Sequence, residues 1–338
     1  MEIGKIPENV LKRSVFKKLT VKRPEVLVHA GVGEDCGILA LNEDEAIVVS
    51  TDPITGTANE IGNLAFHITA NDLASSGAEP VGLLLTIILP PQASEEDLKE
   101  IMCQISAQAE KYNVEVLGGH TEVSDVVNQI LVSVTGVGKI NKQRIVKTGG
   151  LKQGNDLVVT KWIGIEGTAI LAAEKEEQLF NHFAMDFLEE AKGFSKLLSV
   201  VPESKIAMEV GVTAMHDVTE GGIFGALWEI AAASGCGIEV NLKKIPIRQE
   251  TIEICEVFDL NPYQLISSGC MLIGTEHGNE LVDALERAGI PATVIGRVVE
   301  GNDRIIINGE EKRFLEPPKA DELYKALRCE CSQSGGIL

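Results

Sequence analysis

Short apolar runs alternate with helix-like apolar repeats along the chain, and this alternation constrains the fold more than any other feature. Residues 46–50 (AIVVS) form the β-branched run that is typical of a buried strand. Residues 60–75 place apolar side chains at helical spacing, as do residues 94–112, where Ser94 and Asp97 form a capping-box pattern. The pattern therefore predicts a fold that mixes strands and helices.

The second half repeats this mixture after a polar, glycine-rich stretch at residues 147–161 (KTGGLKQGNDLVVTK). Residues 278–288 predict a helix that lies between two strand patterns. A chain of 338 residues has room for about two domains of ordinary size. We therefore expect one domain at residues 1–150 and a second at residues 151–338, with a mobile tail from about residue 328.

Charge and composition exclude several classes of protein. A formal net charge of −20 and an aromatic content of 4% argue against nucleic acid as a partner. The sequence has no run of about 18 apolar residues, so no membrane span is expected. The N-terminal residues lack the apolar core of a secretory signal, and the seven mostly isolated cysteines suit a reducing compartment. These features predict a cytoplasmic protein.

The segment from Met215 to Ala231 (MHDVTEGGIFGALWEIA) places acids and glycines directly before a helical repeat. A helix N-terminus attracts anions, and the glycines Gly221 and Gly222 would let a phosphate approach the backbone closely. Asp217 would repel that phosphate unless a cation lay between them. The segment therefore predicts a phosphate site that includes a metal ion.

Other acids also stand at the ends of apolar segments, beside glycine, threonine or asparagine. They are Asp35 (GVGEDCG), Asp52 (VVSTDP), Asp72 (TANDLASSGA) and Glu122 (GGHTE). Asp72 continues the inward-facing stripe of its predicted helix, where an unpaired carboxylate is costly. Magnesium prefers hard oxygen ligands and takes one or two carboxylates per ion plus phosphate oxygens. Convergence of these acids would suit two or more ions that hold a triphosphate for phosphoryl transfer.

Simpler readings of the same residues remain open. An isolated aspartate beside glycine is usually a turn or a cap, and His120 and His216 are more often polar packing residues than ligands or bases. No zinc-ligand spacing, P-loop or nucleophile-elbow motif is present. Most of the isolated cysteines suit buried, small hydrophobic positions; these are Cys36, Cys103, Cys236, Cys255 and Cys270.

The ordered motifs GEDCG, STD, ANDLASSGAEP, GGHTE and HDVTEGG resemble those of the aminoimidazole ribonucleotide (AIR) synthetase superfamily, over about residues 25–315. The layout is most similar to the HypE branch. The resemblance implies an α/β N-terminal domain whose sheet forms a β-barrel with its copy across a homodimer. It also implies an α+β C-terminal domain with a mixed sheet, and ATP in a cleft close to the dimer partner.

The resemblance also implies roles for individual residues. It makes Asp35, Asp52, Asp72 and Asp217 ligands of Mg²⁺ or phosphate, with Asp52, Asp72 and Asp217 as the catalytic set. Further residues would help to hold ATP: Asn71, Gly118, Gly119, Thr121, Glu122, Thr219, Gly221 and Gly222, together with Asp35.

The implied chemistry is ATP-dependent activation of a substrate oxygen. HypE proteins dehydrate a carbamoyl group on their own terminal cysteine, with a hydrogenase-maturation protein as partner. This chain instead carries Cys329 and Cys331 nine and seven residues before its last residue. It also has Glu220 where many HypE proteins have arginine. A small-molecule kinase similar to thiamine monophosphate kinase, and a non-catalytic nucleotide-binding assembly protein, are the alternatives.

Overall fold

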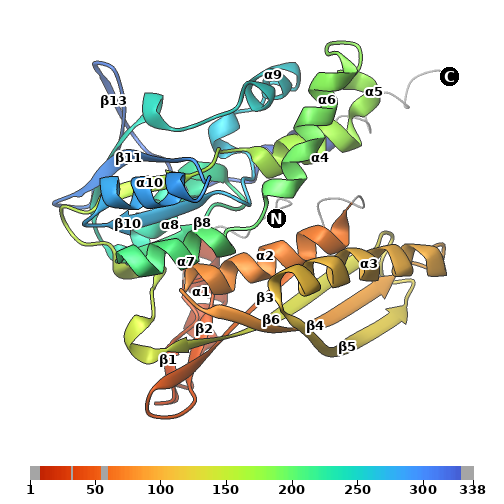
Figure 1. The fold of residues 1–338 in the computed structure, drawn as a ribbon, viewed down its shortest axis with the longest axis horizontal. Helices are drawn as coiled ribbons and strands as arrows, with labels where there is room; N and C mark the ends of the chain where they lie inside the picture. The colour runs from red at the N-terminus through yellow and green to blue at the C-terminus, as the bar shows by residue number, and fades with distance from the viewer. Residues whose placement is uncertain (1–7, 32, 55–59, 329–338) are drawn as a thin grey trace.

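The computed structural model describes residues 8–31, 33–54 and 60–328 of the chain. Two β-sheets form two layers, and helices lie between and around them (Figure 1). The first sheet comes from the N-terminal part of the chain and the second from the C-terminal part. The mixture of strands and helices that the sequence predicts in both halves is confirmed.

The first sheet has six strands in the order β1-β2-β3-β6-β4-β5. All neighbouring pairs are antiparallel except β4 and β5, which run parallel. The strands are β1 (Val26–Val28), β2 (Gly37–Ala40), β3 (Glu45–Ile54), β4 (Glu79–Leu89), β5 (Glu115–Val123) and β6 (Leu131–Asn141). The helices of this part are α1 (Glu8–Ser14), α2 (Ile61–Ser75) and α3 (Glu95–Tyr112).

Helices α2 and α3 cover one face of this sheet (Figure 1). Alternate residues of β4, including Leu83, Leu85 and Ile87, are buried in the core that these helices close. The predicted capping box is confirmed, because the Ser94 side chain accepts from the Asp97 amide and the Asp97 carboxylate accepts from the Ser94 amide. Helix α3 therefore begins where its sequence predicts.

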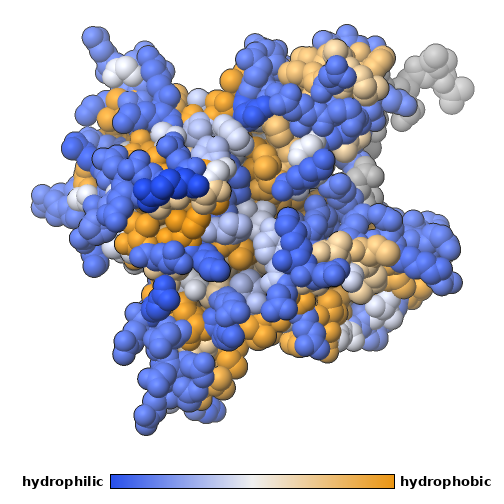
Figure 2. All heavy atoms as spheres, viewed as in Figure 1, coloured by the Kyte–Doolittle hydropathy of each residue, from blue (hydrophilic) through white to orange (hydrophobic). Residues whose placement is uncertain are grey.

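The opposite face of the same sheet has no helix over it in the part of the chain that the structure describes (Figure 1). Strand β5 lies at the sheet edge, and nearly all of its residues are exposed. Several large apolar side chains of this sheet are exposed: Leu39, Val81, Leu84, Leu117 and Val123. Hydrophobic atoms are visible along the lower edge of this layer in Figure 2. A sheet with one bare apolar face is expected to find a partner surface.

The second sheet has seven strands in the order β13-β12-β9-β11-β7-β10-β8, antiparallel except for the parallel pair β12 and β9. The strands are β7 (Asp156–Thr160), β8 (Ala214–Asp217), β9 (Gly237–Asn241), β10 (Met271–Thr275), β11 (Ala292–Val299), β12 (Arg304–Asn308) and β13 (Glu311–Phe314). The largest apolar core in this domain packs α8 against the sheet.

Eight α-helices complete the described C-terminal part: α4 (Ile165–Glu174), α5 (Glu176–Leu179), α6 (Met185–Lys192), α7 (Val201–Val210), α8 (Gly222–Ser234), α9 (Gln249–Val257), α10 (Gly278–Arg287) and α11 (Leu323–Arg328). Short 3-10 helices lie at Phe16–Lys18, Lys142–Arg144, Thr148–Gly150, Gly193–Leu197, Leu242–Lys244 and Pro262–Gln264. Among the described residues, no helix combines the length and hydropathy needed to cross a membrane.

Two glycine-containing segments belong to regular elements. Strand β5 continues through Gly118 to Val123 because this segment pairs with β4. Helix α4 begins at Ile165, directly after Gly164, and places Glu166 in its first turn. In both segments, contacts with neighbouring elements override the local preference of glycine for loops.

Candidate active site

Four aspartates meet where the end of α2, strand β3, the end of β8 and the loop before β2 come together. Asp72 lies on α2, Asp52 on β3 and Asp217 at the last position of β8. Asp35 lies in the loop between β1 and β2. Burial raises the pKa of Asp72, and the neighbouring charges of Asp217, Asp52 and Asp35 raise it further. The predicted convergence of these four carboxylates is therefore found in one cluster, which we call the acidic cluster.

Ser50 connects Asp72 with Asp52 inside this cluster. Ser50 and Asp52 lie two positions apart on β3, so their side chains lie on the same face of the strand. The Ser50 hydroxyl contacts Asp72 Oδ2 at short range and lies 3.3 Å from Asp52 Oδ2. Asp72 is only 7% exposed, and burial together with the neighbouring acids raises its pKa well above the ordinary value. The two carboxylates are therefore close enough to share a cation or a proton.

Asp217 is almost completely buried, with an exposed fraction of 1%. The Ser75 hydroxyl donates to its Oδ1 over 3.3 Å, while its Oδ2 has no hydrogen-bond partner among the described residues. Burial raises the pKa of Asp217 to about 7, and the nearby charge of Asp35 contributes in the same direction. A buried carboxylate oxygen without a partner is costly, so this position suits a bound cation.

His216 lies between two carboxylates beside the cluster. Its Nδ1 is 2.8 Å from Asp35 Oδ2, and its Nε2 is 3.1 Å from Glu229 Oε2. Burial alone would lower the pKa of His216, but Asp35 and Glu229 together raise it well above its ordinary value. Asp35, His216 and Asp217 each offer one potential ligand atom, and these three atoms lie within 4.8 Å of one another.

The chemistry of these side chains fits Mg²⁺. The available atoms are carboxylate oxygens, which are the ligands that magnesium prefers. His216 directs both ring nitrogens at carboxylates, so it does not compete as a soft nitrogen ligand. The unpartnered oxygen of Asp217 is the position that a cation would satisfy. The residues present therefore meet the requirements of a magnesium site.

Asn71, expected to help hold ATP, has a different set of partners. Its Nδ2 donates to the Leu198 carbonyl over 2.8 Å, and its Oδ1 accepts from the Val200 amide over 2.8 Å. The side chain is fully buried and joins α2 to the segment before α7. Asn71 therefore supports the neighbouring Asp72 by fixing the helix against the second domain.

The glycine pair before α8 is also used by the protein itself. The Gly221 amide donates to Asp321 Oδ2 over 2.7 Å. Gly222 has a left-handed backbone (φ +59°), and a Cβ there would lie 2.7 Å from the carbonyl oxygens of Tyr263 and Leu265. Thr219, by contrast, is partly exposed. Gly222 is therefore needed for close packing, and the role of both glycines at a phosphate stays a prediction.

Four other expected nucleotide-binding residues lie on β5, away from the acidic cluster. The strand register aligns Asp52 with Val134, then Leu85, then Gly119. Three strand spacings separate β3 from β5, which corresponds to about 14 Å. A Cβ at Gly119 would lie 1.9 Å from the Leu85 carbonyl oxygen, so the glycine permits close pairing of the strands. These four residues of β5 are Gly118, Gly119, Thr121 and Glu122. Within a single chain they do not reach the aspartates.

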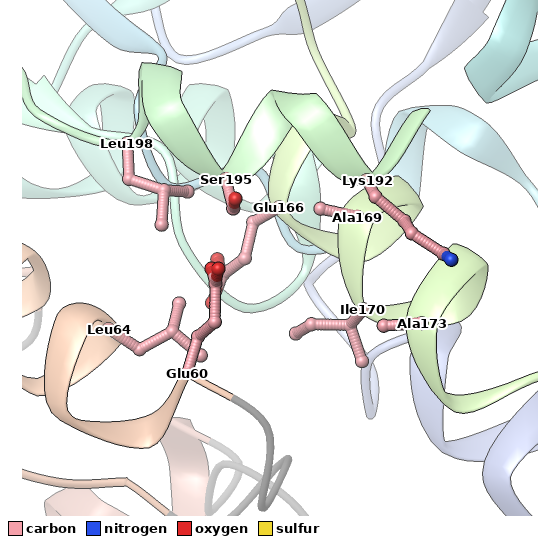
Figure 3. Close-up of a pocket in the computed structure, with 9 residues that line it drawn as sticks. All are labelled: Glu60, Leu64, Glu166, Ala169, Ile170, Ala173, Lys192, Ser195 and Leu198. Carbon is pink, nitrogen blue, oxygen red and sulfur yellow. The ribbon is translucent and has the colours of Figure 1, made fainter. Parts of the chain in front are cut away.

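A separate cavity of about 140 Å³ lies between the two domains (Figure 3). Glu60 and Leu64, at the start of α2, line one side, and residues of α4 and of the segment Lys192–Leu198 line the other. The start of α2 is roughly 18 Å from Asp72 along the helix axis. Glu166 lies on the cavity wall, and burial raises its pKa to about 7. The Ser268 amide, which donates a hydrogen bond to Glu166, acts in the opposite direction.

Several residues of the site are not marked by any motif in the sequence. Ser50, Ser75 and Asp321 contact predicted site residues, and Glu229 contacts His216, but serine and a helical glutamate have no distinctive spacing. The sequence alone favours a polar packing role for His216, and its position next to Asp217 is the signal that indicates a role in the cluster. Cys36, Cys255 and Cys270 are buried as expected, whereas Cys103 is exposed and Cys236 is intermediate. Cys329 and Cys331 lie outside the described residues.

Comparison with protein families gives two matches that follow one another along the chain. Residues 33–140 match the N-terminal domain of AIR synthase related proteins, and residues 152–308 match the C-terminal domain. The chain is 29% identical over 334 residues to a putative hydrogenase expression/formation protein of Methanocaldococcus jannaschii, covering 95% of this chain and 96% of that protein. It is 30% identical over 292 residues to the carbamoyl dehydratase HypE of Rhodobacter capsulatus, covering 85% and 83%.

Solved structures show the same architecture. The crystal structure of Escherichia coli HypE has a TM-score of 0.73 and 25% sequence identity, covering 90% of this chain and 95% of that chain. A HypE crystallised in complex with ATP has a TM-score of 0.71 at 20% identity, covering 93% and 95%, and at that identity it shows the fold alone.

Proposed function

The chain belongs to the AIR synthase related family, and from this premise we propose that it transfers the γ-phosphoryl group of ATP to a substrate oxygen at the acidic cluster. It is an ATP-dependent enzyme similar to HypE. The observation that carries the proposal is the meeting of Asp35, Asp52, Asp72 and Asp217, which are far apart in sequence. Buried carboxylates that repel one another suit a site that positions a polyphosphate through cations.

Mg²⁺ is the cation proposed for this site, held by Asp35, Asp52, Asp72 and Asp217. When bound, it would neutralise negative charge on the transferring phosphoryl group. The chain's own contribution is to hold the carboxylates in place. Ser50 fixes Asp72 beside Asp52, and Ser75 orients Asp217. Asp72 and Asp217 lie in a buried environment, where electrostatic interactions are stronger than in water.

We infer a homodimer in which the bare face of the six-stranded sheet meets its copy. The exposed apolar side chains of β4 and β5 support this inference, as does the open edge of β5. Such an assembly would bring one protomer's Gly118, Gly119, Thr121 and Glu122 toward the partner's ATP. Thr219 would contribute from the same protomer as the acidic cluster.

For a HypE-type reaction, the acceptor is the oxygen of a carbamoyl group on a thiol sulfur. That oxygen attacks the γ-phosphorus, and ADP leaves. The carbon–oxygen bond then breaks with release of phosphate, while nitrogen gives up two protons and the carbamoyl group becomes a nitrile. Cys331 and Cys329 are the candidate thiols of this chain. A hydrogenase-maturation protein that loads the thiol is the proposed partner, because a HypE with the same fold has been crystallised in complex with HypF.

A product analysis separates this reaction from its alternatives. Purified protein is mixed with Mg-ATP and a panel of acceptors that includes an S-carbamoyl-cysteine peptide and thiamine monophosphate. Formation of ADP, free phosphate and a peptide lighter by one water supports dehydration. A phosphorylated acceptor indicates a small-molecule kinase instead. ATP-induced stabilisation without turnover of any acceptor would support a non-catalytic assembly protein, and no response to ATP would contradict the proposal altogether.

A further inference from the structure

His216 connects three elements through one imidazole ring. It lies on β8, where it is 1% exposed. One nitrogen faces Asp35, from the loop of the N-terminal part, and the other faces Glu229 on α8, at 2.8 Å and 3.1 Å. Glu229 is itself buried, with an exposed fraction of 7%. The three side chains therefore form a continuous chain of polar contacts, buried at His216 and Glu229, that ends at a carboxylate of the acidic cluster.

Asp35 is the member of the cluster that most needs such support. It lies outside any helix or strand, whereas Asp52, Asp72 and Asp217 lie on regular elements. Its side chain is 21% exposed, compared with 2% for His216. A carboxylate on a loop loses more conformational freedom when it binds a cation than one already held in place. Contact with His216 engages Oδ2 of Asp35.

The present contacts of His216 favour a supporting role over direct metal binding. A histidine that binds a metal must present a free nitrogen lone pair, and here each ring nitrogen faces a carboxylate oxygen. Ligating side chains are commonly oriented by such outer partners, and loss of the partner typically weakens metal affinity by roughly ten- to a hundred-fold.

We propose that His216, held by Glu229, is a positioning residue that orients Asp35 toward Asp217 and thereby sets the divalent-cation affinity of the acidic cluster. This inference rests on the proposed function, because it assigns a support to the same site. It adds two residues, His216 and Glu229, that act through Asp35 and do not themselves contact the cation.

The test measures cation binding directly. The dissociation constant of Mn²⁺, used as the probe, is determined by calorimetry on the full chain with a non-hydrolysable ATP analogue present. His216→Asn should weaken Mn²⁺ binding by roughly ten-fold or more. Glu229→Gln keeps the shape of the side chain and one acceptor oxygen, so this variant should weaken Mn²⁺ binding less. The matched control is His277→Asn, an exposed histidine at the start of α10, which should leave binding unchanged.

A double-mutant cycle separates positioning from general structural support. If His216 acts through Asp35, the Asp35→Asn/His216→Asn double variant should bind Mn²⁺ no more weakly than Asp35→Asn alone. Equal losses from His216→Asn with and without Asp35 would overturn the inference. If His216→Asn does not fold, an unchanged Mn²⁺ affinity in Glu229→Gln would overturn it instead. Absence of Mn²⁺ binding by the unmodified chain would contradict the proposed function itself, which is a distinguishable result.

Discussion

Buried carboxylates that face one another repel unless a proton or a cation lies between them. Asp72 and Asp217 are in this position, and the pKa of each is raised by burial and by the neighbouring acids. A folded protein accepts this cost when the cluster binds a ligand that stabilises it. At the scale of single residues, cation binding and stability should therefore respond in opposite directions to the loss of one charge.

Asp72→Asn should reduce Mg-ATP binding at least ten-fold while the apo protein keeps its free energy of unfolding or gains some. The amide still accepts from Ser50, but it removes one negative charge from the cluster. Calorimetric titration and urea unfolding measure the two quantities. Asp186→Asn, on the exposed start of α6, is the control for loss of one surface charge. Unchanged nucleotide affinity in Asp72→Asn would remove this residue from the site.

Glu166 provides a test that depends on pH. Its ordinary pKa of 4.5 applies to the unfolded chain, whereas burial raises the folded-state pKa to about 7. Between these values the folded state binds more protons, so the free energy of unfolding falls as the pH rises. This one group accounts for about 3 kcal/mol over the whole window.

Glu166→Gln should lack that fall, because the amide does not ionise and still accepts from the Ser268 amide. Urea unfolding at each pH gives the free energy of unfolding of both proteins. The difference, variant minus unmodified protein, should be larger at about pH 8 than at about pH 5. The exposed Glu177→Gln should leave the pH dependence as it is. Parallel stability curves for Glu166→Gln and the unmodified protein would show that Glu166 ionises normally in the fold.

At the scale of elements, the start of α8 depends on how closely two backbones approach. Gly222 has a left-handed backbone and lies against the carbonyls of residues 263 and 265. Gly235, which ends the same helix, is also left-handed (φ +63°) but has open space around its Cβ position. The two glycines therefore separate the effect of backbone conformation from that of steric contact.

Gly235→Ala should cost roughly 1 kcal/mol, the typical penalty of a left-handed residue with a side chain. Gly222→Ala should cost several kcal/mol, because a methyl group there overlaps carbonyl oxygens in addition to the same backbone strain. Chemical denaturation of both variants gives the comparison. Equal losses would mean that the 263–265 backbone moves aside easily and that close packing does not fix the start of α8.

At the scale of the whole molecule, one sheet face has no cover in the described chain. The exposed side chains of Leu84 and Leu117 belong to neighbouring strands on this sheet. Burial of such a face contributes about 25 cal/mol for each Å² removed from water. The assembled protein should therefore be more stable than a single chain, and its stability should depend on protein concentration.

Leu117→Asp should convert the proposed dimer into a monomer, because a charge would be buried in an apolar contact. Sedimentation velocity over a range of concentrations measures the change, and ATP affinity should fall with it if the partner's β5 contacts the nucleotide. Phe314→Asp is the control, since Phe314 is a similarly exposed apolar residue on β13, in the other domain. A monomeric unmodified protein at all concentrations would contradict the dimer.

The sequence by itself determined the types of element and the identity of the acids. Apolar periodicity is a local property, so it located the strand at 46–50, the helix at 60–75 and the capping box at Ser94. The inward position of Asp72 also follows from the helical period alone. The resemblance of the ordered motifs to one superfamily then supplied the fold class, which the family matches confirm.

Only the tertiary structure decided which side chains meet. Ser75 contacts Asp217 and His216 contacts Asp35 although they lie 142 and 181 positions apart, and no local pattern marks such pairs. The fold likewise assigned Asn71 to a contact between domains and the Gly221 amide to Asp321. These outcomes depend on how the two domains pack together, because hydrogen-bond partners are chosen by proximity in space and by burial, and neither is encoded in the spacing along the chain.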